Sequence, residues 1–210
     1  MNPEFLALSI VILLFSVIVH EVMHGVVAKK FGDSTAELAG RLTLNPIPHI
    51  DLFGTILLPA LLIISGSPIL LGWAKPVPVN PLNFSNLRKG ELFVSAAGIL
   101  ANFSLALIAA LIYRFLDFLP YLFPALIGSL LAFTVLINLV LGVFNLLPIP
   151  PLDGSKILQS RLSGNLARTY QQIEPYGMFI LFFLLLSGSL GFVFGLARTV
   201  TNILLGIGSF

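Results

Sequence analysis

Residues 5–28 read FLALSIVILLFSVIVHEVMHGVVA, and this run is long and apolar enough to decide the fold. A helix needs about 20 mostly apolar residues to cross the hydrocarbon core of a bilayer. Lys29 and Lys30 follow directly and mark the end of the run at the membrane surface. The run lacks a basic leading segment and contains two histidines and a glutamate, so we expect a retained membrane helix rather than a cleaved signal peptide.

The rest of the sequence has the same character. Apolar residues make up 57% of the chain, charged residues 10%, and the mean hydropathy is +1.02, whereas soluble domains carry about 25% charged residues. Further apolar runs cover about 53–73, 92–112, 121–147 and 176 onward. We therefore expect an all-α polytopic membrane protein with about four to six membrane helices. It would form one membrane-embedded domain over 1–210, with a core at 5–159 and a C-terminal helical segment at about 172–210.

Two of these runs are interrupted. Ser187-Gly188-Ser189 breaks the last one, which leaves open whether it is one span or two short segments. Ser65-Gly66-Ser67-Pro68 breaks the run at 53–73 into two arms, each too short to cross. The sequence therefore predicts a re-entrant segment between the first helix and the next span.

The positive charges favour the same topology. If the run at 53–73 crossed the membrane, the eleven Lys and Arg residues would divide six to five between the two sides. If it enters and returns, they divide nine to two, as the positive-inside rule demands. We expect an N-terminus outside the cell and a cytoplasmic face that carries the larger group: Lys29, Lys30, Arg41, Lys75, Arg88, Lys89, Lys156, Arg161 and Arg168.

Composition also excludes several functions. Cysteine is absent, which rules out thiol catalysis and cysteine-type zinc sites, so any metal must be held by histidine and carboxylate. The net charge is only +2 and no basic stripe with interleaved aromatic residues is present, so no nucleic-acid partner is expected.

The first helix carries a histidine pair with metal-ligand spacing. His20 and His24 are four residues apart and lie on one helix face, while Glu21 follows the first of them as a possible base. A polar network inside the membrane is the alternative. Each ionisable residue in a membrane helix costs about 3 kcal/mol to insert, and few acidic partners exist in the apolar runs. A metal site is therefore the better account of all three.

Catalytic zinc takes three protein ligands, so a third is needed. Asp153 follows the run at 121–147 through a proline-rich stretch that cannot remain regular helix. The alternative is an N-cap for a helix over 154–166. With the segment at 53–73 re-entrant, the runs at 5–28 and 121–147 point in the same direction. His24 and Asp153 can then reach the same depth in the membrane.

These residues resemble the site-2 protease family of intramembrane metalloproteases, in its short prokaryotic form without PDZ or CBS domains. The similar segments are HEVMH at 20–24, GRLTLNP at 40–46, HID at 49–51, GWAKP at 72–76 and NLLPIPPLDG at 145–154. Together they cover roughly residues 5–159. Residues 97–102, AGILAN, lack the proline that relatives typically have, although Asn102 is in the matching place.

The resemblance implies an intramembrane endopeptidase that binds one Zn²⁺ per chain through His20, His24 and Asp153, with Glu21 as general base. Its substrates would be transmembrane segments of other membrane proteins, cut near the cytosolic side of a prokaryotic cell membrane, with the lipid bilayer as surroundings. We expect minor β-strand content near 38–48 that could pair with an extended substrate.

Other roles stay open at this point. Asn145 and Asn102 could hold the substrate or its transition state, or could form helix–helix hydrogen bonds. His49 and Asp51 could line the site, although His49 is not expected to be a ligand. A metal-ion or proton transporter could use the same cluster, and an inactive relative could act as a membrane chaperone, although all four core residues are intact. The oligomeric state is undetermined.

Overall fold

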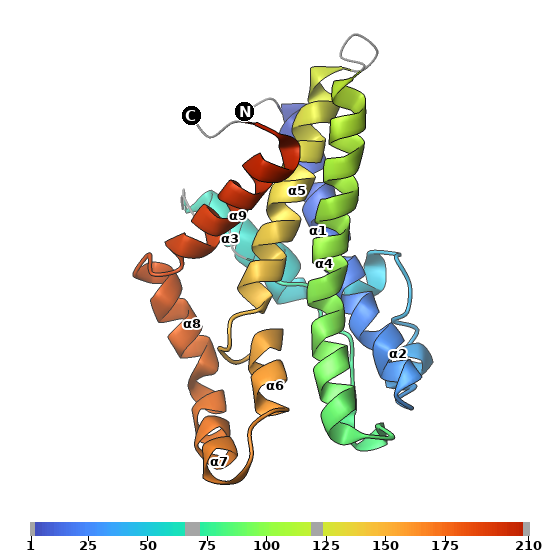
Figure 1. The fold of residues 1–210 in the computed structure, drawn as a ribbon, viewed down its shortest axis with the longest axis vertical. Coiled ribbons are helices and arrows are strands. Elements are labelled where there is room, and N and C mark those ends of the chain that lie inside the picture. Colours follow the sequence, from blue (N-terminus) through green and yellow to red (C-terminus); the bar gives the residue numbers. More distant parts are fainter. Residues whose placement is uncertain (1–2, 66–71, 119–123, 208–210) are drawn as a thin grey trace.

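Three long helices form the centre of the computed structural model, which describes residues 3–65, 72–118 and 124–207. They are α1 (Pro3–Lys30), α4 (Leu87–Asp117) and α5 (Ala125–Asn145), each long and apolar enough to cross a membrane. Asn86 starts α4, because its side chain accepts a hydrogen bond from the N–H of Lys89 at 3.0 Å. In Figure 1, α1 and α5 run in the same direction and α4 runs against them, as the sequence predicts.

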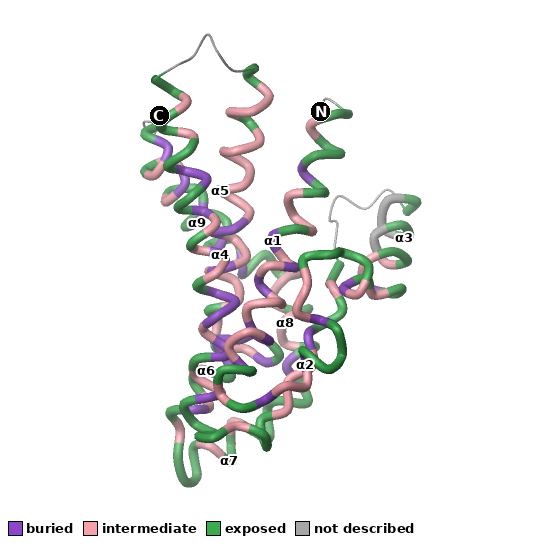
Figure 2. Tube along the Cα trace, turned by 90° about the vertical axis from the view of Figure 1, so that its right-hand side faces the viewer, coloured by how far each residue is buried: buried purple, intermediate pink, exposed green. Residues whose placement is uncertain are grey.

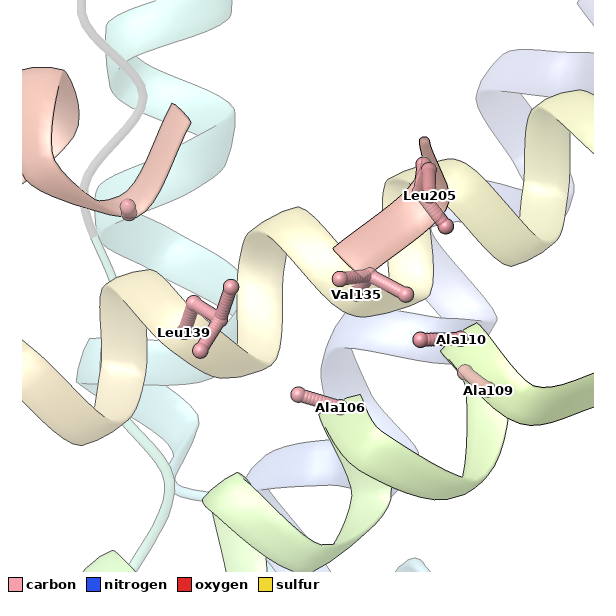
Figure 3. Close-up of a cluster of buried hydrophobic side chains, with 7 residues drawn as sticks. Ala106, Ala109, Ala110, Val135, Leu139 and Leu205 are labelled. Carbon is pink, nitrogen blue, oxygen red and sulfur yellow. The ribbon is translucent and has the colours of Figure 1, made fainter. Parts of the chain in front are cut away.

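Small residues bring α4, α5 and α9 (Gly191–Leu205) close together. Their buried contact, shown in Figure 3, contains four alanines between larger apolar side chains. Small side chains let membrane helices approach closely. Much of each long helix is exposed or half-buried (Figure 2). Large apolar residues are frequent among the exposed positions, as expected where lipid is the solvent. The cluster consists of Ala106, Ala109, Ala110, Val135, Leu139, Ala197 and Leu205.

The segment after α1 enters and returns, which confirms the re-entrant prediction. It begins with the π-helical turn η2 (Leu52–Leu57) and continues as α3 (Leu58–Ile64). The chain then comes back beside the start of this segment, where the N–H of Trp73 donates to the carbonyl of Gly54 at 3.1 Å. The Thr55 hydroxyl donates to the Trp73 carbonyl at 2.8 Å. Most of the predicted Ser65–Pro68 break lies outside the described residues.

The β-strand expected near 38–48 is not formed, and that prediction was wrong. The segment follows the short helix α2 (Thr35–Leu38) and ends in the 3-10 turn η1 (Ile47–His49). Local side chains take the backbone donors that a strand would need. The Thr43 hydroxyl accepts the N–H of Asn45, and the Asn45 side chain accepts the N–H of Ile47, both at 3.1 Å. Such local bonds compete with sheet pairing.

The C-terminal segment is two helices rather than one straight span. After α6 (Asp153–Gln159), α7 (Gly164–Ile173) and the turns η3 (Pro81–Asn83) and η4 (Glu174–Tyr176) complete the polar end of the molecule. The stretch Gly164–Leu186, which ends in helix α8 (Gly177–Leu186), then meets α9 at an angle of 69°. Gly188, with φ of 71°, allows the turn. If this bent pair is one span, the described residues contain four spans, the lower end of the expected range.

Asp33 ties the loop after α1 to the loop before α4. Its fully buried carboxylate accepts the backbone N–H of Asn80 at 2.7 Å, the side-chain amide of Asn83 at 2.8 Å and the N–H of Thr35 at 3.1 Å. The Thr35 hydroxyl donates as well. Burial alone would raise the pKa of the Asp33 carboxyl, but these bonds outweigh it and hold the pKa below its usual value of 3.8.

We expect Asp33→Asn to lower the free energy of unfolding by about 1–3 kcal/mol at pH 7, because a hydrogen-bonded buried charge is lost. The pKa of Asp33 is lower in the folded chain. Its stabilisation is therefore present above the unfolded pKa and is lost as the pH falls through the folded pKa. Thermal unfolding in detergent at several pH values measures this. Asp117→Asn, which removes an exposed carboxylate, is the control, and equal stability of wild type and Asp33→Asn at pH 7 would contradict the assignment.

Candidate metal centre

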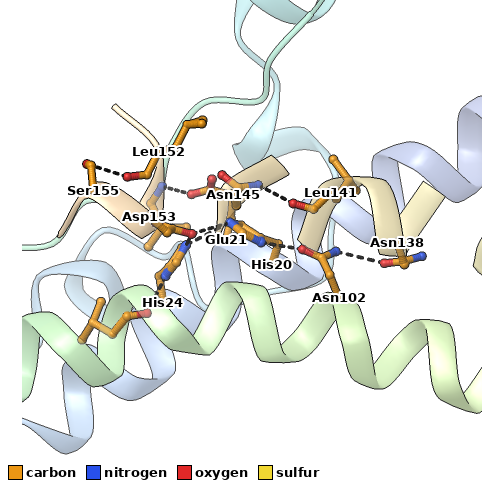
Figure 4. A network of polar contacts seen from close by, with 12 residues as sticks. His20, Glu21, His24, Asn102, Asn138, Leu141, Asn145, Leu152, Asp153 and Ser155 are labelled. Carbon is orange, nitrogen blue, oxygen red and sulfur yellow. Dashed lines mark hydrogen bonds and ion pairs between the residues drawn. The ribbon is translucent and has the colours of Figure 1, made fainter. Parts of the chain in front are cut away.

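Two histidines of α1 and the first residue of α6 converge within the membrane helices (Figure 4). The Nε2 atoms of His20 and His24 are 3.0 Å apart. The Oδ2 atom of Asp153 lies 3.1 Å from the first and 3.2 Å from the second. The three residues are exposed by only 7%, 9% and 6%. The structure thus brings together the three ligands expected from the sequence.

The outer nitrogens of both imidazoles are fixed by acceptors. Nδ1 of His24 lies 2.7 Å from the carbonyl of Val94, which can only accept, so this nitrogen carries the hydrogen. Nδ1 of His20 lies 2.7 Å from Oδ1 of Asn102. The side-chain amide of Asn102 donates at 2.9 Å to Oδ1 of Asn138, whose own amide donates to the Thr134 carbonyl at 2.9 Å. This series of bonds sets every amide orientation in the row.

The consequence is that both Nε2 atoms present lone pairs to each other and to a carboxylate oxygen. Three atoms that each present a lone pair repel one another unless a positive charge lies between them. Oδ2 of Asp153 is also buried, and the described part of the chain offers it no hydrogen-bond donor. A tetrahedral zinc ion with ligand bonds of about 2.0–2.1 Å has ligand atoms about 3.3–3.4 Å apart. The separations of 3.0–3.2 Å are close to that spacing, so the donor set fits Zn²⁺.

Asp153 reaches the histidines because the chain between α5 and α6 is not helical. Residues 148–151 contain three prolines, and α6 begins only at Asp153, with Leu152 as its N-cap. The N-cap role considered for Asp153 is therefore not adopted. A Cβ atom at Gly154 would lie 2.2 Å from the carbonyl oxygen of Leu146, so only glycine allows α6 to pack against the end of α5.

Glu21 and Asn145 line the same cavity as the three ligands. The cavity has a volume of about 930 Å³ and is bounded by α1, α8 and the extended residues 72–79, among others. This lies within the range of substrate-binding cavities. Oε2 of Glu21 accepts the backbone N–H of Val77 at 2.8 Å. The side-chain amide of Asn145 donates to the carbonyl of Leu141 at 3.0 Å.

Comparison with known proteins decides the family. The pattern described as "Peptidase family M50" matches residues 121–188. The chain is 39% identical to YwhC of Bacillus subtilis (strain 168) over 186 residues. These residues cover 87% of this chain and 81% of the relative. The chain belongs to peptidase family M50. The resemblance to site-2 proteases seen in the motifs is thereby confirmed.

Other M50 relatives extend this comparison. Rip2 of Mycolicibacterium smegmatis is 33% identical over 178 residues, 84% of this chain and 66% of the relative. MJ0392 of Methanocaldococcus jannaschii is 30% identical over 162 residues, 77% of this chain and 36% of the relative. All three relatives carry the words zinc metalloprotease in their names. No solved structure gives a significant match. Membership of this family identifies the chain as a zinc metalloprotease.

The M50 site contains residues that the sequence motifs did not single out. Asn138 supports Asn102, and its amide also donates to the hydroxyl of Ser16 at 2.9 Å. An asparagine in the middle of an apolar run could have been noticed, because buried polar groups in membranes need partners. Asn102 itself is fully buried behind His20 and is not among the residues that line the cavity.

His49 and Asp51 lie outside the metal cluster of this M50 peptidase. Nε2 of the fully buried His49 lies 2.9 Å from the carbonyl of Thr43, and its Nδ1 faces Arg41. The Asp51 side chain accepts the N–H of Gly54 at 2.7 Å and caps η2. Both residues organise the loop between α1 and the re-entrant segment.

Gly98 of α4 packs directly on the two histidines. A Cβ atom there would lie 2.6 Å from Cε1 of His20 and 2.6 Å from Nε2 of His24. We expect Gly98→Ala to displace the imidazoles and weaken zinc binding by at least about 10–100-fold, the size found for disturbed ligand orientation. Competition with a fluorescent zinc chelator measures the affinity. Gly195→Ala on α9, where a Cβ atom meets nothing within 4 Å, is the matched control; unchanged affinity in Gly98→Ala would show that the ligands lie elsewhere.

Proposed function

We propose that this M50 peptidase is an intramembrane zinc endopeptidase that hydrolyses peptide bonds in the transmembrane segments of other proteins. His20, His24 and Asp153 would hold one Zn²⁺ per chain, and Glu21 would be the general base. The observation that supports this most directly is the triangle of three buried donor atoms, 3.0–3.2 Å apart, among helices that can cross a membrane.

The chain's own groups have distinct tasks in hydrolysis. When bound, Zn²⁺ supplies Lewis acidity that polarises the scissile carbonyl and makes water acidic near neutral pH. Glu21 takes a proton from the attacking water and gives it to the leaving amine. Oε2 of Glu21 is held by the N–H of Val77. Oε1 has no hydrogen-bond partner among the described residues, so it is the oxygen that moves the proton.

The two asparagines would act at different distances from the reaction. Asn102 keeps the hydrogen of His20 on Nδ1, so that Nε2 stays available to the metal. We assign it this orienting role rather than contact with substrate, because Asn102 is 0% exposed. Asn145 lines the cavity, which supports a role for its side chain in holding an extended substrate or its developing oxyanion.

The walls of the cavity suit an unwound apolar peptide. Met178, Leu181, Phe182 and Leu185 present one face of α8 to it, and residues 72–79 border it as an extended chain. A substrate helix must unwind to expose a peptide bond, and an extended segment can then lie beside residues 72–79. These residues take the place of the strand expected near 38–48 as the surface along which the substrate lies.

We also propose that the site faces the cytoplasmic side of a prokaryotic cell membrane. Lys29, Lys30, Arg88 and Lys89 lie at the end of α1 and the start of α4, which are on the same side of the molecule (Figure 1). The positive-inside rule places such a cluster in the cytoplasm. His24 lies little more than one helical turn before Lys29.

Reconstitution in liposomes with a panel of single-span membrane proteins tests the proposal. We expect zinc-dependent cleavage, abolished by a chelator and restored by Zn²⁺, with product masses that place the cut bond inside the apolar segment. Cleavage confined to soluble loops would contradict the intramembrane activity. Uptake of zinc into the liposomes without any cleavage would favour the transporter alternative instead.

A further inference from the structure

Residues 73–77 form an extended chain that is held at every second residue. Trp73 bonds to Gly54 and Thr55 through its N–H and carbonyl. The N–H of Lys75 donates to the carbonyl of His49 at 2.9 Å, and the N–H of Val77 donates to Glu21 at 2.8 Å. Alternate residues of an extended chain point their backbone groups to the same side. This side of the segment is therefore fixed to the protein as far as the proposed base.

Arg41 provides the central attachment of that segment. Its Nη2 donates to the carbonyl of Lys75 at 2.6 Å and faces Nδ1 of His49 at 3.5 Å. Arg41 is only 6% exposed, and its Nε has no hydrogen-bond partner among the described residues. The described residues give Arg41 no carboxylate within ion-pair distance. A buried charge without a counter-ion is costly, so its bond to a backbone carbonyl suggests a specific use.

The bond between Val77 and Glu21 gives Arg41 that use. Arg41 holds the carbonyl of Lys75, and Val77, which holds Glu21, is only two residues further along the chain. Pro76 lies between them and restricts the backbone further, because its φ is fixed. With Oε2 of Glu21 anchored on Val77, Oε1 is directed by the same contact.

We propose that Arg41 is a positioning residue for Glu21, acting through the backbone of Lys75 and the N–H of Val77. The proposal rests on the proposed function, in which Glu21 is the base. It assigns Arg41 a part in the orientation of the reacting carboxylate without contact to substrate or metal.

Kinetics of purified variants in liposomes test the proposal. Arg41→Gln should lower kcat about 10- to 100-fold, the scale of a small misplacement of a reacting group, with KM and zinc content unchanged. Arg41→Lys should recover most of kcat, because an ammonium group can still donate to the Lys75 carbonyl. Incorporation of α-hydroxyvaline at position 77 forms an ester, which replaces the N–H by an oxygen while keeping the side chain, and should lower kcat as Arg41→Gln does. Arg88→Gln, at an exposed arginine, is the matched control.

The double variant separates positioning from general damage. If Arg41 acts through the Val77 N–H, Arg41→Gln combined with the ester should be no slower than either change alone. Multiplying effects would overturn the proposal. A wild-type kcat in the ester variant would overturn it as well, and that measurement does not require Arg41→Gln to fold. A wild-type enzyme that cleaves nothing would instead contradict the proposed function.

A labelling experiment tests the attachment without any activity. The chain has no cysteine, so Ala74→Cys reports on the segment alone. In the Arg41→Gln background, maleimide should label it faster than in the Arg41 background, whereas Met178→Cys on α8 should label equally in both. Equal rates at position 74 would show that Arg41 does not hold the segment.

Discussion

Glu21→Gln is expected to abolish peptide-bond hydrolysis while zinc remains bound. Glutamine has nearly the same size and can still lie in the cavity, but it cannot accept the proton that the attacking water must lose. A general base contributes about 10²–10⁴-fold to a rate, so residual activity should fall to that extent. The three proposed ligands, His20, His24 and Asp153, are untouched. Zinc content by elemental analysis and cleavage rate in liposomes together measure the effect.

Glu37→Gln provides the control for this variant. Glu37 lies on the surface, where it pairs with Lys29 at 2.6 Å, and exposed ion pairs contribute little. The control should keep the wild-type rate. Glu21→Gln with a wild-type rate would assign the base to another group, and loss of zinc in that variant would make Glu21 a ligand.

Asp153→Ala is expected to remove zinc as well as activity. Two histidines would remain, and catalytic zinc requires three protein ligands. The loss of affinity should exceed the roughly 100-fold effect of disturbing residues around a metal site. The buried Nε2 atoms of His20 and His24 would also lose the carboxylate that balances the charge of the metal. Titration with zinc in the presence of a competing chelator measures the affinity.

Asp51→Asn is the control that separates the loss of a zinc ligand in Asp153→Ala from the loss of just any carboxylate near the site. Asp51 caps η2 and is not part of the metal cluster, so its variant should bind zinc as wild type does. If Asp153→Ala retained wild-type affinity, the third ligand would have to be sought among other residues.

The sequence predicted the parts of the structure that follow from helix periodicity and from the cost of charge in a membrane. His20 and His24 lie on one face of α1 because of their spacing, and the division of positive charges required the chain to return after residue 53. Asp153 could be placed near them only because these two features fix the directions of α1 and α5.

Other features depended on contacts between distant backbone groups, which leave no pattern in the sequence. The N–H of Val77 on Glu21 joins residues that are far apart in the chain, and a backbone donor is present at almost every position. The side-chain turns at Thr43 and Asn45 replace the strand expected near 38–48, and such residues occur in many loops without forming these bonds. Gly98 is one small residue among several in α4, and only the packed histidines show its role.

The wide separation of the donors along the chain has a consequence for biosynthesis. His20 and His24 enter the membrane with α1, whereas Asp153 emerges from the ribosome only after α4 and α5 have been made. A partly translated chain therefore holds two histidines without the carboxylate that completes the triangle. With the proposed ligand set, the metal site can be completed only after Asp153 has been made and α6 has packed beside α1.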